Sequence, residues 1–278
     1  MRKRNYDGKQ ILVIVLLSVF MLAAAAFLNY MEKDQARETA STQAAISSPA
    51  AVSAASKASV DSAVTPDQTE GIATYLQGPK SWKARREWSG RWGTQYYDGG
   101  SFGGFGCGLC CMANVYCSLT DYRCSPLDMY QYAKEKSMYE GGGAIDWGYM
   151  KQTLASAGFT CDVGRKPSEY ASFQNIVKNS QACIVVVSSS NSTCYWKDTP
   201  GHYVTLFLYD EKTDKIFLAD SGDPSHNRQW VPLKKIYRSL KTANRWQYLM
   251  VTAYDKKKDG WKHRGIGGRC VLPEGWQV

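Results

Sequence analysis

The stretch GGSFGGFGCGLCCMANVY, residues 99–116, joins a glycine-rich loop to an apolar helical pattern. Gly106 and Gly108 flank Cys107, and they permit a sharp turn and the close approach of another backbone. A thiol in the first turn of a helix lies beside unpaired N–H groups at the positive end of the helix dipole, which favours the thiolate. The stretch therefore predicts a cysteine nucleophile at a helix N-terminus, which needs a base.

Two residues later in the chain can complete such a site. His202 precedes the predicted strand 203–209, and Asp220 follows the predicted strand 215–219. Because only a short turn joins these strands, we expect an antiparallel hairpin whose open end brings His202 and Asp220 together. A carboxylate beside an imidazole fixes its tautomer, and the imidazole can then deprotonate a thiol. Cys107, His202 and Asp220 are thus the predicted nucleophile, base and orienting group.

Nearby titratable residues have simpler explanations. Asp223 is a second candidate for the orienting group, but it lies in the turn Gly222-Asp223-Pro224, where a turn former needs no catalytic role. His226 and His263 lie among polar and basic residues, and we expect both to be solvated. Asp220 is therefore preferred over Asp223 as the partner of the catalytic histidine.

The order and setting of these residues resemble the papain-like cysteine peptidases. The nearest branch is the bacterial one that includes the double-glycine leader (bacteriocin-processing-type) peptidases and their secreted relatives. The residues that carry the resemblance are Gly106-Cys107-Gly108 at a helix start, Gly201-His202-Tyr203-Val204 on a strand, and Asp220 after a strand. It covers about residues 72–254 and implies a papain-like α+β fold with a cysteine nucleophile, a histidine base and an aspartate that orients it.

The resemblance also implies a glutamine upstream of the nucleophile that stabilises the oxyanion together with the cysteine N–H. Gln77 follows the predicted short strand 72–76, and Gln95 lies nearer in sequence. Gln77 is preferred because an oxyanion donor must be rigidly held. The chain departs from the family's pattern at Leu109-Cys110-Cys111, where relatives usually have proline and a small residue, so Cys110 is a competing nucleophile.

Two other functions fit parts of the sequence. Cys107 and Cys110 form a C-x-x-C motif, as in thioredoxin-like thiol–disulfide oxidoreductases. Such motifs normally follow a hydrophobic strand, however, and a redox site would leave the His–Asp pair without a role. The other alternative is a catalytically degenerate domain that binds peptides or wall polymer. No second C-x-x-C completes a zinc site, and the glycine loop lacks the Lys-Ser/Thr ending of a phosphate cradle, so we expect no metal or nucleotide cofactor.

Periodicity predicts helices first and an antiparallel sheet afterwards, which is an α+β domain. The predicted helices are residues 108–119, 125–136, 146–157, 168–179 and 232–240. The predicted strands are residues 72–76, 182–187, 203–209, 215–219 and 247–254.

The N-terminal quarter has a different composition. Residues 1–10 form a basic tail, and residues 11–31 are predicted to be a transmembrane signal-anchor helix with the body of the protein outside the cell. Small residues at 23–26 make a cleaved signal peptide, and thus a secreted protein, the alternative. The Ala/Ser-rich residues 32–70 are predicted to be a disordered stalk, leaving residues 71–278 for the peptidase domain.

Charge and cysteine content bound the partners. The 278 residues carry a net charge of +9, which favours anionic surroundings such as a membrane surface or an acidic cell-wall polymer. No nucleic-acid-binding motif is present, so we expect a peptide or protein substrate instead. Nine cysteines, all after residue 100, fit one reactive thiol with up to four disulfides; buried free thiols, as at Cys183, are the alternative.

Overall fold

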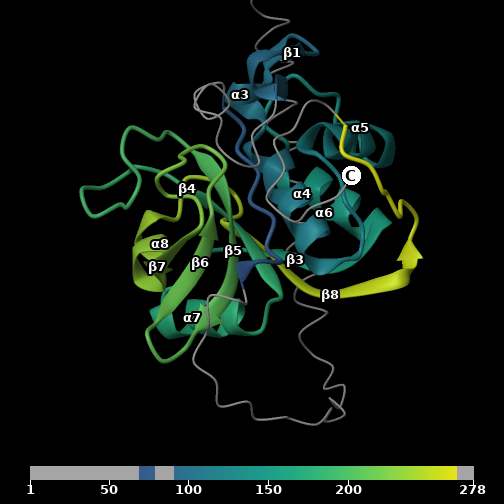
Figure 1. Cartoon of the computed structure of the whole chain (residues 1–278). Coiled ribbons are helices and arrows are strands. Elements are labelled where there is room, and N and C mark those ends of the chain that lie inside the picture. The colour runs from purple at the N-terminus through teal and green to yellow at the C-terminus, as the bar shows by residue number, and fades with distance from the viewer. Residues whose placement is uncertain (1–68, 79–90, 268–278) are drawn as a thin grey trace, which may run out of the picture. The chain divides into compact units, whose positions relative to one another are not determined.

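A six-stranded antiparallel sheet lies at the centre of the fold, in the strand order β3-β8-β4-β5-β6-β7 (Figure 1). This computed structural model describes residues 69–78 and 91–267, which all belong to one unit, Ser62–Val278. The strands of the sheet are β3 (Ala157–Gly164), β4 (Ala182–Val187), β5 (His202–Asp210), β6 (Lys215–Ala219), β7 (Gln229–Pro232) and β8 (Tyr248–Asp259). A separate hairpin is formed by β1 (Tyr96–Tyr97) and β2 (Gly100–Ser101).

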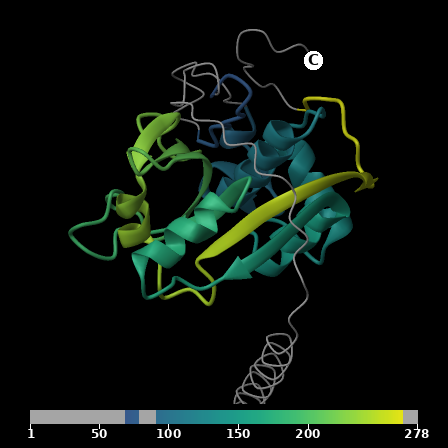
Figure 2. The same cartoon turned by 90° about the horizontal axis from the view of Figure 1, so that it is seen from below.

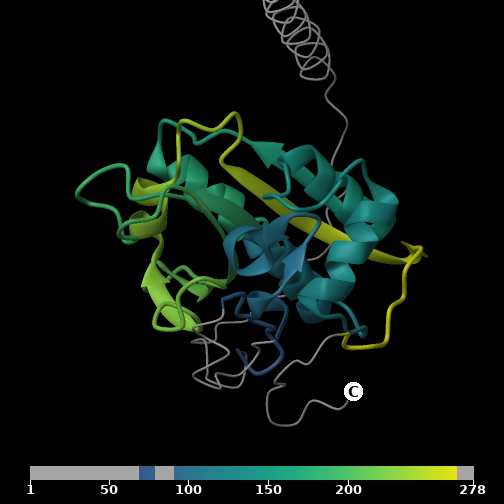
Figure 3. The same cartoon turned by 90° about the horizontal axis from the view of Figure 1, so that it is seen from above.

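Helices lie on both faces of the large sheet. The helices of the described residues are η2 (Arg91–Thr94), α3 (Phe102–Phe105), α4 (Cys107–Leu119), α5 (Pro126–Lys136), α6 (Trp147–Ser156), α7 (Tyr170–Lys178) and α8 (Leu233–Ser239). Helices α4, α5 and α6 pack in one hydrophobic core, and α7 and α8 pack in another on the opposite face of the sheet (Figures 1 and 3).

The sheet separates these two cores because its inner strands alternate between them. On β5, Tyr203 and Phe207 belong to the core of α4, whereas Val204 and Leu206 belong to the core of α7 and α8. All six residues of β4 are buried for the same reason. A strand covered on both faces is continuously apolar, which is the pattern that its sequence shows.

Side-chain caps and a glycine mark the ends of α5 and α6. The Ser125 side chain accepts a hydrogen bond from the Asp128 N–H, and the Asp128 carboxylate accepts one from the Ser125 N–H, which is a capping box at the start of α5. Asp146 caps α6 through the Gly148 N–H. Gly158 follows α6 at φ +85°, where an added Cβ would lie 2.7 Å from a backbone oxygen, so only glycine fits.

The α+β class is confirmed, with four corrections to the strands. Residues 157–164 form β3, which was not predicted because its pairing partner β8 is almost a hundred residues later in the chain (Figure 2). The short β7 was missed as well, and β8 runs to Asp259, beyond the predicted end. Residues 72–76 are not a strand of either sheet, since side chains bind their backbone: Asn114 accepts from the Tyr75 N–H and Ser118 from the Ala73 N–H.

The predicted basic tail, the transmembrane helix and almost all of the stalk fall within residues 1–68, which lie outside the described residues. Cys270 also lies outside them, near the C-terminal end. Within 69–78 and 91–267, no helix combines the length and apolar character needed to cross a bilayer.

Candidate active site

Cys107 is the first residue of α4, as the glycine-flanked motif predicted. Its side chain is buried, with 6% of the residue exposed. The flanking glycines have a packing role that the sequence did not reveal. An added Cβ would lie 2.4 Å from the ring of Phe102 at Gly106 and 2.6 Å from Ile145 at Gly108. These two glycines therefore make room for core side chains rather than for a substrate backbone.

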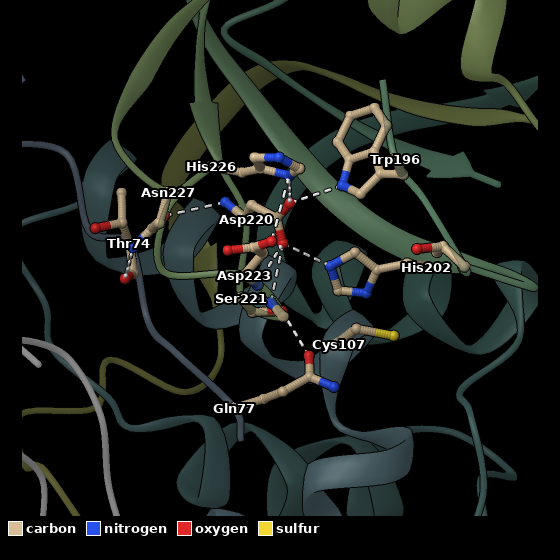
Figure 4. A network of polar contacts seen from close by, with 12 residues as sticks. Thr74, Gln77, Cys107, Trp196, His202, Asp220, Ser221, Asp223, His226 and Asn227 are labelled. Atoms are coloured by element: carbon tan, nitrogen blue, oxygen red, sulfur yellow. Dashed lines mark hydrogen bonds and ion pairs between the residues drawn. The ribbon is translucent and has the colours of Figure 1, made fainter. Parts of the chain in front are cut away.

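His202 and Asp220 lie side by side, which confirms the proximity predicted from the hairpin of β5 and β6. The Nε2 atom of His202 is 2.8 Å from Oδ1 of Asp220. A carboxylate only accepts, so Nε2 carries the proton in this contact, and Nδ1 is the ring nitrogen left to take a proton from the thiol. Figure 4 shows the Cys107 sulfur on the side of the imidazole away from Asp220.

The pKa values of this pair shift toward an ion pair. Burial alone raises the pKa of the Cys107 thiol, but the hydrogen bond and charge of His202 outweigh it, so the pKa lies below its usual value. Burial lowers the pKa of His202, whereas its contacts with Asp220 and Cys107 raise it more strongly, to a net increase. A lowered thiol pKa and a raised imidazole pKa together favour thiolate and imidazolium, the reactive form of a cysteine nucleophile.

Asp220 is fully buried and well supplied with donors. Its Oδ2 accepts from the Trp196 indole N–H at 2.7 Å, and its Oδ1 accepts from the backbone N–H of Gly222 at 2.9 Å. Burial raises the pKa of the carboxyl, but the hydrogen bonds from His202 and Trp196 and the nearby His226 imidazole hold it well below its usual value. Asp220 is therefore a fixed anion behind the imidazole.

Asp223, the other candidate, does not contact His202. Its side chain is 46% exposed, and its carboxylate accepts from the N–H and hydroxyl of Ser225, as in an ordinary turn. Of the two aspartates, the structure thus brings only Asp220 to the imidazole.

The prediction that His226 and His263 are solvated is wrong. His226 is 21% exposed, stacks on Tyr195 with ring centroids 4.3 Å apart, and places Nδ1 3.5 Å from the Asp220 carboxylate. His263 is 30% exposed and stacks on Trp261 at 4.6 Å. Their neighbours come from distant segments, so the polar residues beside them in the sequence did not indicate their surroundings.

Gln77 is buried close to the nucleophile, and its amide is held at both ends. Its Nε2 donates to the backbone oxygen of Gly103 at 3.1 Å, and its Oε1 accepts from the Ser221 hydroxyl at 2.6 Å. The Gln77 N–H also donates to the Ser221 backbone oxygen at 2.8 Å. Since a carbonyl oxygen only accepts, the amide orientation is fixed, and the second Nε2 hydrogen has no assigned acceptor (Figure 4). Gln95, in contrast, is exposed and accepts from the Tyr97 hydroxyl.

Ser221 was missed from the sequence. Its position directly after Asp220 was a usable signal, because the residue after a site carboxylate lies in the same turn. Its contact with Gln77 joins residues 144 positions apart, which no local pattern encodes.

The remaining thiols of the nucleophile motif are in the core. Cys110 and Cys111 are 0% and 1% exposed, and neither forms a disulfide with Cys107. Burial holds the pKa of the Cys111 thiol well above its usual value, which leaves it protonated and unreactive. Across 69–78 and 91–267, no cluster of three or more His, Cys, Asp or Glu side chains is arranged to hold a metal ion.

A cavity of about 480 Å³ opens beside the imidazole. His202 and Asp220 line it together with Tyr195, Trp196, Lys197 and His226. A ligand can therefore reach His202 through this cavity, along the wall that Tyr195 and Trp196 form.

Comparisons with known proteins give the following. No protein-family model matches the chain, and no curated protein does. Among solved structures, the peptidase domain of Streptococcus ComA, a bi-functional ABC transporter involved in quorum sensing, is similar, at 14% identity and a TM-score of 0.36, over 52% of this chain and 90% of that one. A C39-like peptidase from Bacillus anthracis is similar at 14% identity and a TM-score of 0.34, over 58% and 92%. Both are peptidases, as the sequence resemblance implied, but likeness this weak supports no inference about activity, which rests on the site residues.

Proposed function

We propose that this protein is a cysteine peptidase that cleaves an amide bond through a thioester acyl-enzyme. The observation that carries the proposal is the arrangement of Cys107, His202 and Asp220, in which a thiol at a helix start meets an imidazole backed by a buried carboxylate. Nucleophilic catalysis needs a nucleophile, a base within reach and a group that orients the base.

The steps follow from these contacts. The Cys107 thiolate attacks the carbonyl carbon and forms a tetrahedral intermediate, whose oxyanion accepts hydrogen bonds from the Cys107 N–H and the Gln77 amide. His202 then gives its proton to the leaving amine, and the C–N bond breaks to leave a thioester. Water, deprotonated by His202, hydrolyses the thioester and restores the thiol. Asp220 stabilises the imidazolium throughout.

The cavity beside His202 indicates where the leaving part of the substrate binds. His202 protonates the amine that departs, so that part of the peptide lies on the histidine side of the site. The cavity contacts His202 and Asp220 and has an aromatic wall at Tyr195 and Trp196. We therefore assign it to the substrate residues after the scissile bond.

The proposed setting is a membrane-anchored enzyme acting outside the cytoplasm, on peptides, exported proteins or cell-wall peptides. The sequence supports it through the basic tail and the apolar residues 11–28, which fit a signal-anchor. Protease shaving of intact cells tests it: the domain should be released from the outside, and protection of the domain in intact cells would contradict this topology.

A thiol-alkylating probe tests the mechanism directly. We expect iodoacetamide to label Cys107 rapidly at a pH below the usual thiol range, because His202 lowers the pKa of the thiol. Peptide mapping identifies the labelled residue. Cys110→Ala should label as the parent protein does, and Cys107→Ala should not label rapidly. Equal dependence on Cys107 and Cys110, with dithiol–disulfide cycling, would favour the oxidoreductase instead.

Gln77→Ala should lower kcat for peptide cleavage by about 10²–10³-fold, the usual cost of one oxyanion donor. Alkylation of Cys107 should hardly change, because that reaction forms no oxyanion. Ser221→Ala should lower kcat in the same direction but less, by about tenfold, since it loosens the amide rather than removing it. Gln95→Ala is the matched control and should leave kcat unchanged; a larger effect there than at Gln77 would refute the assignment.

A further inference from the structure

Two cysteines away from the candidate active site lie with their sulfur atoms in contact. The Sγ atoms of Cys117 and Cys124 are 3.8 Å apart, and the residues are 2% and 0% exposed. Cys117 lies near the end of α4, and Cys124 lies just before α5. The Cys117 sulfur is also 3.3 Å from both the backbone N and the backbone O of Cys124. The loop between α4 and α5 thus brings the Cys124 side chain into contact with the Cys117 side chain.

The other buried thiols outside the site have oxygen atoms as their polar neighbours. These contacts are Cys161 with the Lys151 carbonyl at 3.7 Å, Cys183 with the Ile184 carbonyl at 4.0 Å, and Cys194 with the Asn191 side chain at 3.2 Å. A disulfide has an S–S length of about 2.05 Å, so the contact between Cys117 and Cys124 closes if each sulfur moves by about 1 Å. Side-chain rotation provides movements of that size.

We propose that Cys117 and Cys124 form a disulfide when the chain folds in an oxidising compartment. The oxidant is itself a disulfide, such as glutathione disulfide or an oxidised thiol oxidoreductase. The Cys117 thiolate attacks one sulfur of the oxidant, which releases one thiol and forms a mixed disulfide. The Cys124 thiolate then attacks the Cys117 sulfur and releases the second thiol. The two protein thiols lose two electrons and two protons, and the oxidant gains them. Because both sulfurs are buried in the folded protein, this exchange takes place during folding, while an oxidant can still reach them.

The bond would secure the part of the fold that carries Gln77. The Tyr75 hydroxyl donates to the Cys124 backbone oxygen at 2.7 Å, and the Tyr75 N–H donates to Asn114 on α4 at 2.8 Å. These two anchors of the segment before Gln77 therefore lie on the two elements that the disulfide would join. The bond leaves Cys107, ten residues earlier on the same helix, available as a thiol.

Counting thiols tests the proposal without any activity measurement. The full chain, exported into an oxidising compartment, is denatured without reductant, alkylated and weighed. The chain has nine cysteines, so seven labels are expected before reduction and nine after it. Trypsin cuts after Arg123, between the two cysteines, so the flanking peptides should stay linked until they are reduced. Nine labels without reduction, or a link between other cysteines, would overturn the proposal.

Variants separate this result from the proposed peptidase. The double variant Cys117→Ser/Cys124→Ser should give seven labels with and without reductant. Cys107→Ser and the matched control Cys161→Ser should each lose one label but keep the difference of two on reduction, so a failed peptidase mechanism leaves this result intact. Reductant should lower the Tm of the parent protein by about 5 °C and leave that of the double variant unchanged, as expected for opening a short loop. A Tm that reductant does not change would also contradict the bond.

Discussion

Cys107→Ala should abolish peptide cleavage, with kcat falling by about 10⁶-fold, as when the nucleophile of a comparable catalytic unit is removed. Alanine keeps the helix start and the small size that the core accepts, so the fold should survive; circular dichroism and the Tm check that it does. The physical reason is that the neighbouring thiols cannot replace it: Cys110 and Cys111 are 0% and 1% exposed in the core that α4 forms.

The measurement is cleavage of a peptide library followed by mass spectrometry, with kcat and KM then determined on the best substrate. Cys110→Ala is the matched control, because it removes a neighbouring thiol of the same helix, and its kcat should stay within about threefold of the parent. Cleavage that persists in Cys107→Ala would refute the acyl-enzyme mechanism, whereas peptide binding without any cleavage by the parent protein would favour the degenerate binding domain.

Asp220→Asn should lower kcat by about 10⁴-fold while preserving the shape of the site, the effect seen when the orienting carboxylate of a catalytic triad becomes an amide. The amide can donate to Nε2 of His202, which then holds its proton on Nδ1 and cannot accept one from the thiol. The carboxylate also raises the pKa of His202, so its removal lowers that pKa and raises that of Cys107.

The sign of the pH effect follows from these shifts. Thiolate and imidazolium coexist above the pKa of the thiol and below the pKa of the imidazole. Losing the carboxylate narrows this range from both ends, so Cys107 alkylation in Asp220→Asn should shift to higher pH. Alkylation rates from pH 5 to pH 9 measure the shift. Asp223→Asn, the matched control, should keep the parent profile, because Asp223 does not contact His202. An unchanged profile in Asp220→Asn would show that Asp220 does not support the imidazole.

Much of the fold follows from local patterns in the sequence. The capping box of Ser125 and Asp128 and the apolar run of β4 each describe a segment by its own residues, and the structure contains both. The missed strand β3 carries such a pattern too: Phe159 and Cys161 are buried and alternate with the exposed Thr160 and Asp162. Its pairing with β8, in contrast, depends on residues far along the chain.

In the candidate site, too, some features follow from local sequence and others from long-range packing. The sequence alone determined that Cys107 starts a helix and that His202 meets Asp220, because glycine and helix periodicity act locally and a short hairpin fixes its own open end. Only the tertiary structure decided that Gln77 is oriented by Ser221, that the Cys107 sulfur lies on the side of the imidazole away from Asp220 (Figure 4), and that Cys117 lies against Cys124. These contacts join separately folded segments, and their geometry is set by how two hydrophobic cores pack on the faces of one sheet. Gly106 and Gly108 illustrate both contributions. Their positions in the sequence predicted the nucleophile, whereas only the tertiary packing against Phe102 and Ile145 explains why these residues are glycines.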